Sequence, residues 1–160
     1  MTVFHGSICE VRTPDLSRSK KNIDFGPGFY VTTLRHQAER WAKRKSARLG
    51  GEAVVTEFNM LDDWSEYRVK TFPAASVEWL DFVCACRNGL TPYTNYDIIS
   101  GKVANDKVYQ AIDMYRRGIW DASRTLTEIT YYEDSQQTAI NNASAIAALL
   151  SFSRSYVVAG

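Results

Sequence analysis

Apolar positions recur with two different spacings along the chain, and these spacings predict a mixture of short strands and helices. Strands, rich in β-branched and aromatic residues, are expected at residues 2–5, 29–33, 53–58, 67–72, 96–99, 138–140 and 152–158. Helices are expected at residues 34–49, 77–88, 105–118 and 142–150, with a weaker helical pattern at 121–130. In the first of these helices, the buried face is expected to include Ala38, Trp41 and Leu49.

The order of these elements predicts one mixed α+β domain over residues 1–160. Strands and helices alternate irregularly, and strands lie near both ends of the chain, which disfavours a regular parallel sheet. The segments 53–58 and 67–72 flank a polar connection and are expected to form a hairpin. Polar and basic residues at 13–22 follow neither period, so a surface loop is expected there.

Composition and charge exclude several classes of protein. The chain has 19 Lys and Arg against 18 Asp and Glu, a formal net charge of +1, so its overall charge indicates no polyanionic partner. Its three cysteines suggest neither a disulfide framework nor a zinc site. The N-terminus does not resemble a signal peptide, and no run reaches the roughly 18 apolar residues of a membrane span. We therefore expect a cytoplasmic protein with no membrane contact and no metal.

Three short segments carry the candidate chemistry. His5, at the end of a strand and beside Gly6, offers a ring nitrogen next to unhindered backbone groups, which suits a ribose hydroxyl and a carboxamide. Tyr30 starts a strand after two nearby glycines and is suited to stacking on a flat heterocycle. The third segment is the pair Gln136 and Gln137, before a late strand. Alone, the histidine is more simply explained by a turn and the tyrosine by a core position.

Together, these segments resemble the three-part signature of ADP-ribosyltransferases of the histidine–tyrosine–glutamate class. More specifically, the chain resembles a bacterial domain-of-unknown-function family, number 3990, which has been grouped with that fold. The similarity covers nearly the whole chain. It includes Phe4-His5-Gly6-Ser7, the segment from Asp24 to Thr32, Ala38 with Trp41 and Ala42, the segment from Tyr96 to Asp106, and Gln137 with Ala145, Ile146, Leu149 and Phe152.

The resemblance implies an ADP-ribosyltransferase-like split β-sheet with flanking helices and a cleft for NAD. In that cleft His5 would bond the nicotinamide ribose, Gly6 would hold the carboxamide through its backbone, and Tyr30 would stack on the nicotinamide. The whole NAD-binding set that the resemblance implies is His5, Gly6, Ser7, Gly28, Phe29 and Tyr30. The implied activity is transfer of ADP-ribose from NAD to a macromolecular acceptor, with release of nicotinamide.

The third catalytic position of the class falls on Gln137 by its spacing from the helix around Ala145, and a shift of one residue would move it to Gln136. Breaking the glycosidic bond develops positive charge on the ribose, which a glutamate stabilises best. A glutamine accepts a hydrogen bond but brings no full charge and cannot act as a general base. Two nearby acids, Glu133 and Asp134, are candidates for the missing carboxylate.

Candidate acceptor-binding residues lie in two places. Asn105 and Asp106 open a helix, where they form an N-cap pair or, alternatively, help to select the acceptor. The helix at 35–48 carries six basic residues against one acid, which makes Arg40 and Arg44 candidates for binding phosphates. An exposed, solvated helix face is the simpler interpretation of that charge.

Three classes of function follow. The first is an NAD-dependent mono-ADP-ribosyltransferase acting on protein or nucleic acid. The toxins that share its fold imply, by analogy, a growth-inhibiting effector with a cognate antitoxin or immunity protein. The second is an inactive member that binds a nucleotide or a protein partner, which Gln137 in place of glutamate favours. The third is a nucleic-acid-binding domain that uses the helix at 35–48.

Overall fold

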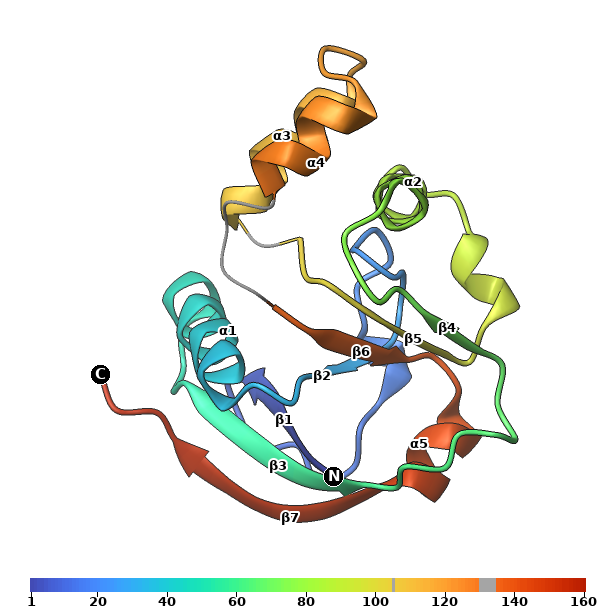
Figure 1. Cartoon of the computed structure of the whole chain (residues 1–160). Helices are drawn as coiled ribbons and strands as arrows, with labels where there is room; N and C mark the ends of the chain where they lie inside the picture. Colours follow the sequence, from blue (N-terminus) through green and yellow to red (C-terminus); the bar gives the residue numbers. More distant parts are fainter. Residues whose placement is uncertain (105, 130–134) are drawn as a thin grey trace.

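The chain folds into two β-sheets surrounded by helices, as the computed structural model in Figure 1 shows. The structure describes residues 1–104, 106–129 and 135–160. Among these residues the strands are β1 (Thr2–Ser7), β2 (Phe29–Val31), β3 (Val54–Met60), β4 (Val69–Thr71), β5 (Ile98–Gly101), β6 (Gln137–Ile140) and β7 (Leu150–Val157). The five α-helices are α1 (Arg35–Leu49), α2 (Val77–Arg87), α3 (Asp106–Arg116), α4 (Ala122–Ile129) and α5 (Ala143–Leu149). The predicted α+β class is confirmed.

The two sheets differ in the direction of their strands. The first has the order β1-β3-β7 and is antiparallel throughout. The second has the order β2-β6-β5-β4, in which β6 is antiparallel to both neighbours and β4 is parallel to β5. The hairpin predicted for 53–58 and 67–72 is therefore wrong, because β3 and β4 lie in different sheets. Their connection, 61–68, is longer than the roughly two to five residues of a hairpin loop and carries the chain from one sheet to the other.

The sheets meet where β1 passes β2. The backbone N–H of Phe4 donates to the carbonyl of Thr32 at 2.8 Å, and the N–H of Thr32 donates back to Phe4 at 3.0 Å. β1 continues through Gly6 to Ser7, because β3 pairs with it along that length. His5 is thus inside a strand and not at its end, and it lies immediately after the junction of the two sheets.

Helix α1 packs closely on the first sheet at a glycine. Successive strand residues point to opposite faces, so Phe4 and Gly6 face α1 while His5 and Ser7 face away from it. A Cβ atom on Gly6 would lie 2.1 Å from the carbonyl oxygen of Ala38. Only glycine allows this close approach of helix and strand.

Two large apolar clusters hold the elements together. One packs α2, α3 and α4 against the second sheet around Trp79 and Ile112. The other fills the space between the two sheets around Phe29, Phe58 and Ile140. In the described part of the chain, no helix is long and apolar enough to cross a membrane.

Candidate functional site

One pocket collects most of the residues that the sequence analysis assigned to NAD binding, and we call it the His5 pocket. Its volume of about 680 Å³ exceeds that of two other pockets, of about 470 and 510 Å³. Its walls come from β1, β2, the start of β6, the C-terminal half of α1 and the loop at 8–24. Of the predicted site residues, the pocket contains His5, Ser7, Gly28, Phe29, Tyr30 and Gln137.

His5 presents a neutral imidazole to this pocket. Its Nδ1 lies 2.7 Å from the carbonyl oxygen of Tyr30, and because a carbonyl only accepts, Nδ1 carries the proton and donates. The ring stacks on Phe29 with the two centroids 4.3 Å apart. Burial, together with the nearby charge of Lys45, lowers the pKa of His5 to about 3. At neutral pH, Nε2 is therefore an unprotonated acceptor suited to a hydroxyl donor.

The hydroxyl of Tyr30 is held by the loop that precedes β2. It donates to the carbonyl of Gly26 at 2.6 Å and accepts from the backbone N–H of Phe25 at 3.0 Å. Burial, reinforced by the Asp24 carboxylate, raises the pKa of Tyr30, so the phenol stays protonated. These bonds fix the aromatic ring at the wall of the His5 pocket and leave no reactive oxygen there.

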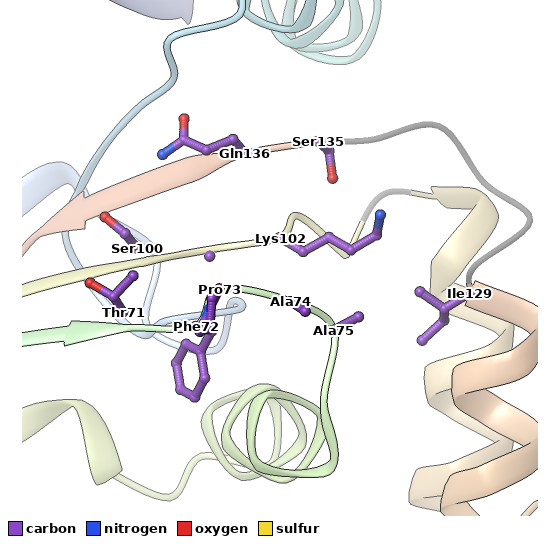
Figure 2. Close-up of a pocket in the computed structure, with 11 residues that line it drawn as sticks. Thr71, Phe72, Pro73, Ala74, Ala75, Ser100, Lys102, Ile129, Ser135 and Gln136 are labelled. Carbon is purple, nitrogen blue, oxygen red and sulfur yellow. The ribbon is translucent and has the colours of Figure 1, made fainter. Parts of the chain in front are cut away.

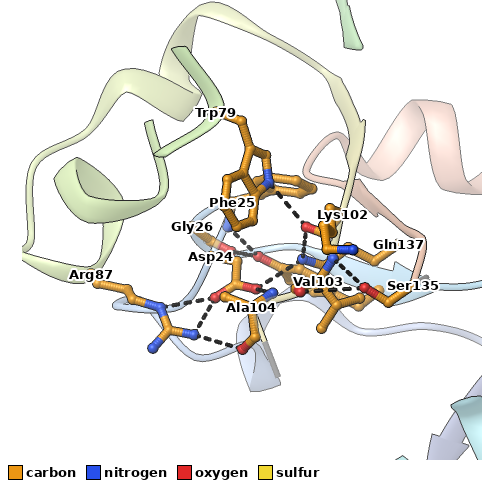
Figure 3. Close-up of polar contacts among 11 residues, drawn as sticks. Asp24, Phe25, Gly26, Trp79, Arg87, Lys102, Val103, Ala104, Ser135 and Gln137 are labelled. Atoms are coloured by element: carbon orange, nitrogen blue, oxygen red, sulfur yellow. Dashed lines mark hydrogen bonds and ion pairs between the residues drawn. The ribbon is translucent and has the colours of Figure 1, made fainter. Parts of the chain in front are cut away.

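Gln137 is held by a buried aspartate to which the sequence analysis gave no role (Figure 3). Its Nε2 donates to Oδ2 of Asp24 at 3.0 Å, and the same oxygen accepts from the backbone N–H of Ala104 at 2.8 Å. Nε and Nη2 of Arg87 both donate to the other oxygen, Oδ1, with Nε at 2.9 Å. Each oxygen of Asp24 thus has two donors, which satisfies the carboxylate although it is only 6% exposed.

These contacts decide which way the Gln137 amide faces. The groups near its Nε2 are the Asp24 carboxylate and, at 3.5 Å, the carbonyl of Lys102, and both are acceptors only. The NH2 group must face these two acceptors, so the amide oxygen Oε1 points away from them. Gln137 lines the His5 pocket while only 3% exposed, so the group it offers to a ligand is an uncharged acceptor oxygen.

The neighbouring Gln136 lies outside the His5 pocket. Its backbone N–H donates to Oε1 of Gln37 at 3.1 Å, and its carbonyl accepts from Nε2 of Gln37 at 2.6 Å. It lines a smaller pocket at the ends of β4 and β5, which Figure 2 shows. Of the two glutamines, Gln137 alone shares a pocket with His5 and Tyr30. Residues 100–102, at the end of β5, also line the smaller pocket and not the His5 pocket.

The backbone of Gly6 is covered. Gly6 does not line the His5 pocket, and its carbonyl accepts from Nζ of Lys45 at 2.7 Å. The Gly6 carbonyl is therefore bound by a side chain of α1, which packs over that face of β1, and the contact with a carboxamide stays a prediction. A ligand would have to displace Lys45 to reach the Gly6 carbonyl.

Basic side chains from α1 and from the loop at 8–24 line the His5 pocket. They are Arg12, Arg18, Lys20, Lys45 and Arg48. Arg12 pairs with Glu10, and Arg18 with Asp15. Burial, followed by the charges of Lys20 and Arg48, lowers the pKa of Lys45 to about 8. Like charges held this close together favour an anionic ligand, which would reduce their mutual repulsion.

The basic residues of α1 have different surroundings. Lys45 and Arg48 line the pocket, whereas Arg35 turns to the first sheet and pairs with Glu57 at 3.2 Å. The acceptor candidates Arg40 and Arg44 are exposed and do not line the His5 pocket. Arg40, Arg44 and Arg48 are spaced four residues apart and share one exposed face of the helix, so a nucleic-acid-binding role for α1 stays a prediction.

The other acceptor candidates and the two candidate carboxylates lie wholly or partly outside the described residues. Asn105 lies outside the described residues, as do Glu133 and Asp134. Asp106 begins α3, and its side chain also lies outside the description. Their roles stay predictions.

The structure of α1 corrects two predictions and identifies one pocket residue, Lys45, that the sequence analysis did not name. Trp41, expected in the core, is half-buried and lines the His5 pocket, and Leu49, expected on the buried face, is 61% exposed. The helix packs through Ala38 and Ala42 because the close contact with β1 leaves room only for small side chains. Lys45 follows these alanines on the same helical face. A lysine on a face that otherwise carries small apolar residues is the feature of the sequence that could have indicated the pocket.

Two of the three cysteines are buried. Burial raises the pKa of Cys84 to about 11 and that of Cys86 to about 12, while Cys9 is exposed. Across the described ranges, no group of three or more His, Cys, Asp or Glu residues is arranged to hold a metal ion.

Comparison with known proteins adds one finding. Residues 1–152 match a family described as Protein of unknown function (DUF3990). No curated protein and no solved structure matches the chain.

Proposed function

The chain belongs to the DUF3990 family, and we propose that it is an NAD-dependent mono-ADP-ribosyltransferase whose donor site is the His5 pocket. One observation carries this proposal: His5, Tyr30 and Gln137, far apart in the sequence, line the same pocket. The volume of about 680 Å³ suits a small molecule, since such sites span roughly 300–1,000 Å³. The proposal includes an ADP-ribosyltransferase type of split sheet, and the junction of two sheets beside His5 supports it.

Three side chains would hold the nicotinamide riboside part of NAD. The ring of Tyr30, fixed through its hydroxyl, would stack on the nicotinamide. Nε2 of His5 would accept a hydrogen bond from one ribose hydroxyl, and Oε1 of Gln137 from another. A neutral His5 suits this role because an imidazolium would repel the cationic pyridinium ring of NAD.

The basic wall of the pocket would take the diphosphate of NAD. The positive charges of Lys20 and Arg48 repel that of Lys45. A phosphate anion bound between these three side chains would attract each of them and offset this repulsion. Trp41 lines the same wall and gives the adenine a flat surface to stack on. The pocket thus provides groups for each part of the dinucleotide.

The proposed reaction breaks the N-glycosidic bond between nicotinamide and ribose. Nicotinamide leaves as a neutral molecule with the bonding electron pair, a nucleophilic atom of the acceptor bonds to the anomeric carbon, and the acceptor releases its proton to solvent. Positive charge develops on the ribose during the exchange. Oε1 of Gln137 stabilises that charge through its dipole alone, so we expect slower turnover than a carboxylate at this position would give.

The second candidate is a nucleotide-binding member without transferase activity. The contact between Gln137 and Asp24 favours it, because the amide is uncharged and the carboxylate is already bound by donors on both oxygens. Neither group acts as a general base in this arrangement. The pocket would then bind NAD and leave it intact.

The proposal extends to a growth-inhibiting role with a neutralising partner protein. If ADP-ribose transfer damages the cell, expression in bacteria should slow growth, and Tyr30→Ala should relieve the inhibition at equal protein level. Equal growth with the two proteins would remove this part of the proposal while leaving NAD chemistry open.

Nicotinamide release from NAD tests the enzymatic proposal. The purified protein is assayed alone and with a bacterial lysate as acceptor source, beside Tyr30→Ala, Gln137→Ala and the control Gln136→Ala. We expect release by the wild type and the control, and a loss in the other two variants while they stay folded. Absence of release from the wild type under both conditions would overturn transferase activity and leave the nucleotide-binding candidate.

A further inference from the structure

We infer that Asp24, held by Arg87, is a positioning residue for Gln137 and is the reason why position 137 carries a glutamine. The catalytic meaning of this inference rests on the proposed function. The pairing itself is a property of the fold, and it can be tested without NAD.

The site of the pairing is built from four separate parts of the chain. Asp24 comes from the loop before β2, Arg87 from the end of α2, Ala104 from the segment after β5, and Gln137 from the start of β6 (Figure 3). A carboxylate as buried as Asp24 is costly unless it is paired and fully hydrogen-bonded. The convergence of these partners indicates that the fold is arranged around this charge.

The two carboxylate oxygens of Asp24 accept hydrogen bonds from different groups. Oδ1 takes both bonds from Arg87, and Oδ2 takes the backbone N–H of Ala104 and the Nε2 of Gln137. Asp24 therefore has no unused lone pair to offer to a ligand and would lose a donor if it took up a proton. Asp24 lines the His5 pocket, but with all its acceptor sites occupied its role is to orient Gln137.

This arrangement requires a donor at position 137. Gln137 supplies one from its amide, 3.0 Å from Oδ2 of Asp24. An ionised glutamate in its place would bring a second carboxylate to about the same distance in a buried site, and two carboxylates so close do not both ionise. The pair would instead share one proton, and its apparent pKa values would belong to both groups together.

The orientation also defines the chemical group that the pocket recognises at this point. With Nε2 bound to Asp24, Gln137 presents Oε1, an acceptor without a full charge. Such an oxygen pairs with a hydroxyl donor, which in the proposed complex is a hydroxyl of the ribose. Asp24 and Arg87 thus select a neutral, hydroxyl-bearing group at the position where a glutamate would favour a cation.

Two matched substitutions of neighbouring glutamines test the inference. Gln137→Glu places a carboxyl against Asp24, whereas Gln136→Glu places one in the smaller pocket, away from any buried carboxylate partner described here. The unfolding temperature and the affinity for NAD are measured for both variants and the wild type from pH 4 to pH 9. The unfolding temperature reports the interaction between Asp24 and residue 137, and the affinity for NAD reports the effect of that interaction on the His5 pocket.

We expect the Gln137→Glu protein to resemble the wild type near pH 4, where its new carboxyl is protonated and donates to Asp24. Because that carboxyl titrates above its ordinary value in the folded state, stability is lost as the pH rises from about 4 through the raised pKa. The affinity for NAD should fall by about tenfold or more over the same range. The Gln136→Glu protein should follow the wild type in both measurements.

The outcomes separate the two proposals. A Gln137→Glu protein whose unfolding temperature follows the wild type at every pH overturns the pairing. Loss of stability with rising pH in that variant, in a protein whose wild type does not bind NAD, keeps the pairing and overturns the proposed function. Loss of stability without loss of affinity, in a protein that binds NAD, overturns the positioning role.

Discussion

The side-chain amide of Gln137 donates to the carboxylate of Asp24 at 3.0 Å, across 113 positions of sequence. This bond joins the strand that carries the third predicted motif to the loop that precedes the tyrosine motif. Because Tyr30 is held by the same loop through Gly26 and Phe25, the geometry of the pocket depends on contacts around Asp24.

Removing Arg87 should destabilise the protein strongly. Arg87→Met leaves the buried carboxylate of Asp24 without its counter-ion, and breaking a buried pair in this way typically costs about 3–5 kcal/mol. Arg116→Met is the matched control, because Arg116 is exposed and its solvent-screened ion pair with Asp113 should contribute little to stability. Urea unfolding at pH 7 measures both, and equal losses would show that Asp24 does not depend on Arg87.

Gly6 should tolerate no side chain. A Cβ atom there would lie 2.1 Å from the Ala38 carbonyl, so Gly6→Ala must push α1 away from β1, at a cost of about 3 kcal/mol or more. At Gly28 the nearest atom, the carbonyl oxygen of Ile140, would be 3.3 Å away, so Gly28→Ala should cost far less. Thermal unfolding of the two variants compares them directly. A stable Gly6→Ala protein would contradict the packing described here.

The affinity for NAD should decrease as Lys45 loses its proton. The pKa of Lys45 is lowered to about 8, so raising the pH from 7 to 9 removes a positive charge from the pocket. We expect about a tenfold weaker affinity for NAD at pH 9 in the wild type. Lys45→Met should bind weakly at both pH values, and Lys43→Met, on the exposed side of the helix, should follow the wild type. A wild-type affinity independent of pH would exclude Lys45 as a phosphate ligand.

Acid should destabilise the protein partly through His5. Its pKa is lowered to about 3 in the folded state, so between the ordinary value and about 3 the unfolded chain takes up a proton that the folded protein does not. The stability that the neutral ring contributes is present above pH 6.5 and is lost as the pH falls towards 3, by at most about 1.4 kcal/mol per pH unit. His5→Gln should therefore unfold with a shallower pH dependence between pH 6 and pH 4 than His36→Gln, which replaces an exposed histidine. Parallel curves for the two variants would contradict the burial of a neutral His5.

The sequence predicted those features that depend on local patterns. Periodicity placed α1 and β2, and the order of motifs predicted that His5 and Tyr30 would share a pocket. The sequence pattern gave the wrong partner strand for β4, because the choice between β3 and β5 depends on contacts between segments far apart in the chain. The role of Asp24 was missed for the same reason, because its partners Arg87 and Gln137 lie far from it in the sequence and contact it only in the folded protein.

The central claim is that the His5 pocket binds NAD with the nicotinamide against Tyr30. Calorimetric titration of NAD into the wild type, Tyr30→Phe and Tyr30→Ala tests it most directly, because phenylalanine keeps the aromatic surface and alanine removes it. We predict saturable binding by the wild type, similar affinity for the phenylalanine variant once its folding is verified, and about tenfold or greater loss for the alanine variant. No binding by the wild type, or equal affinity in all three proteins, would contradict the claim.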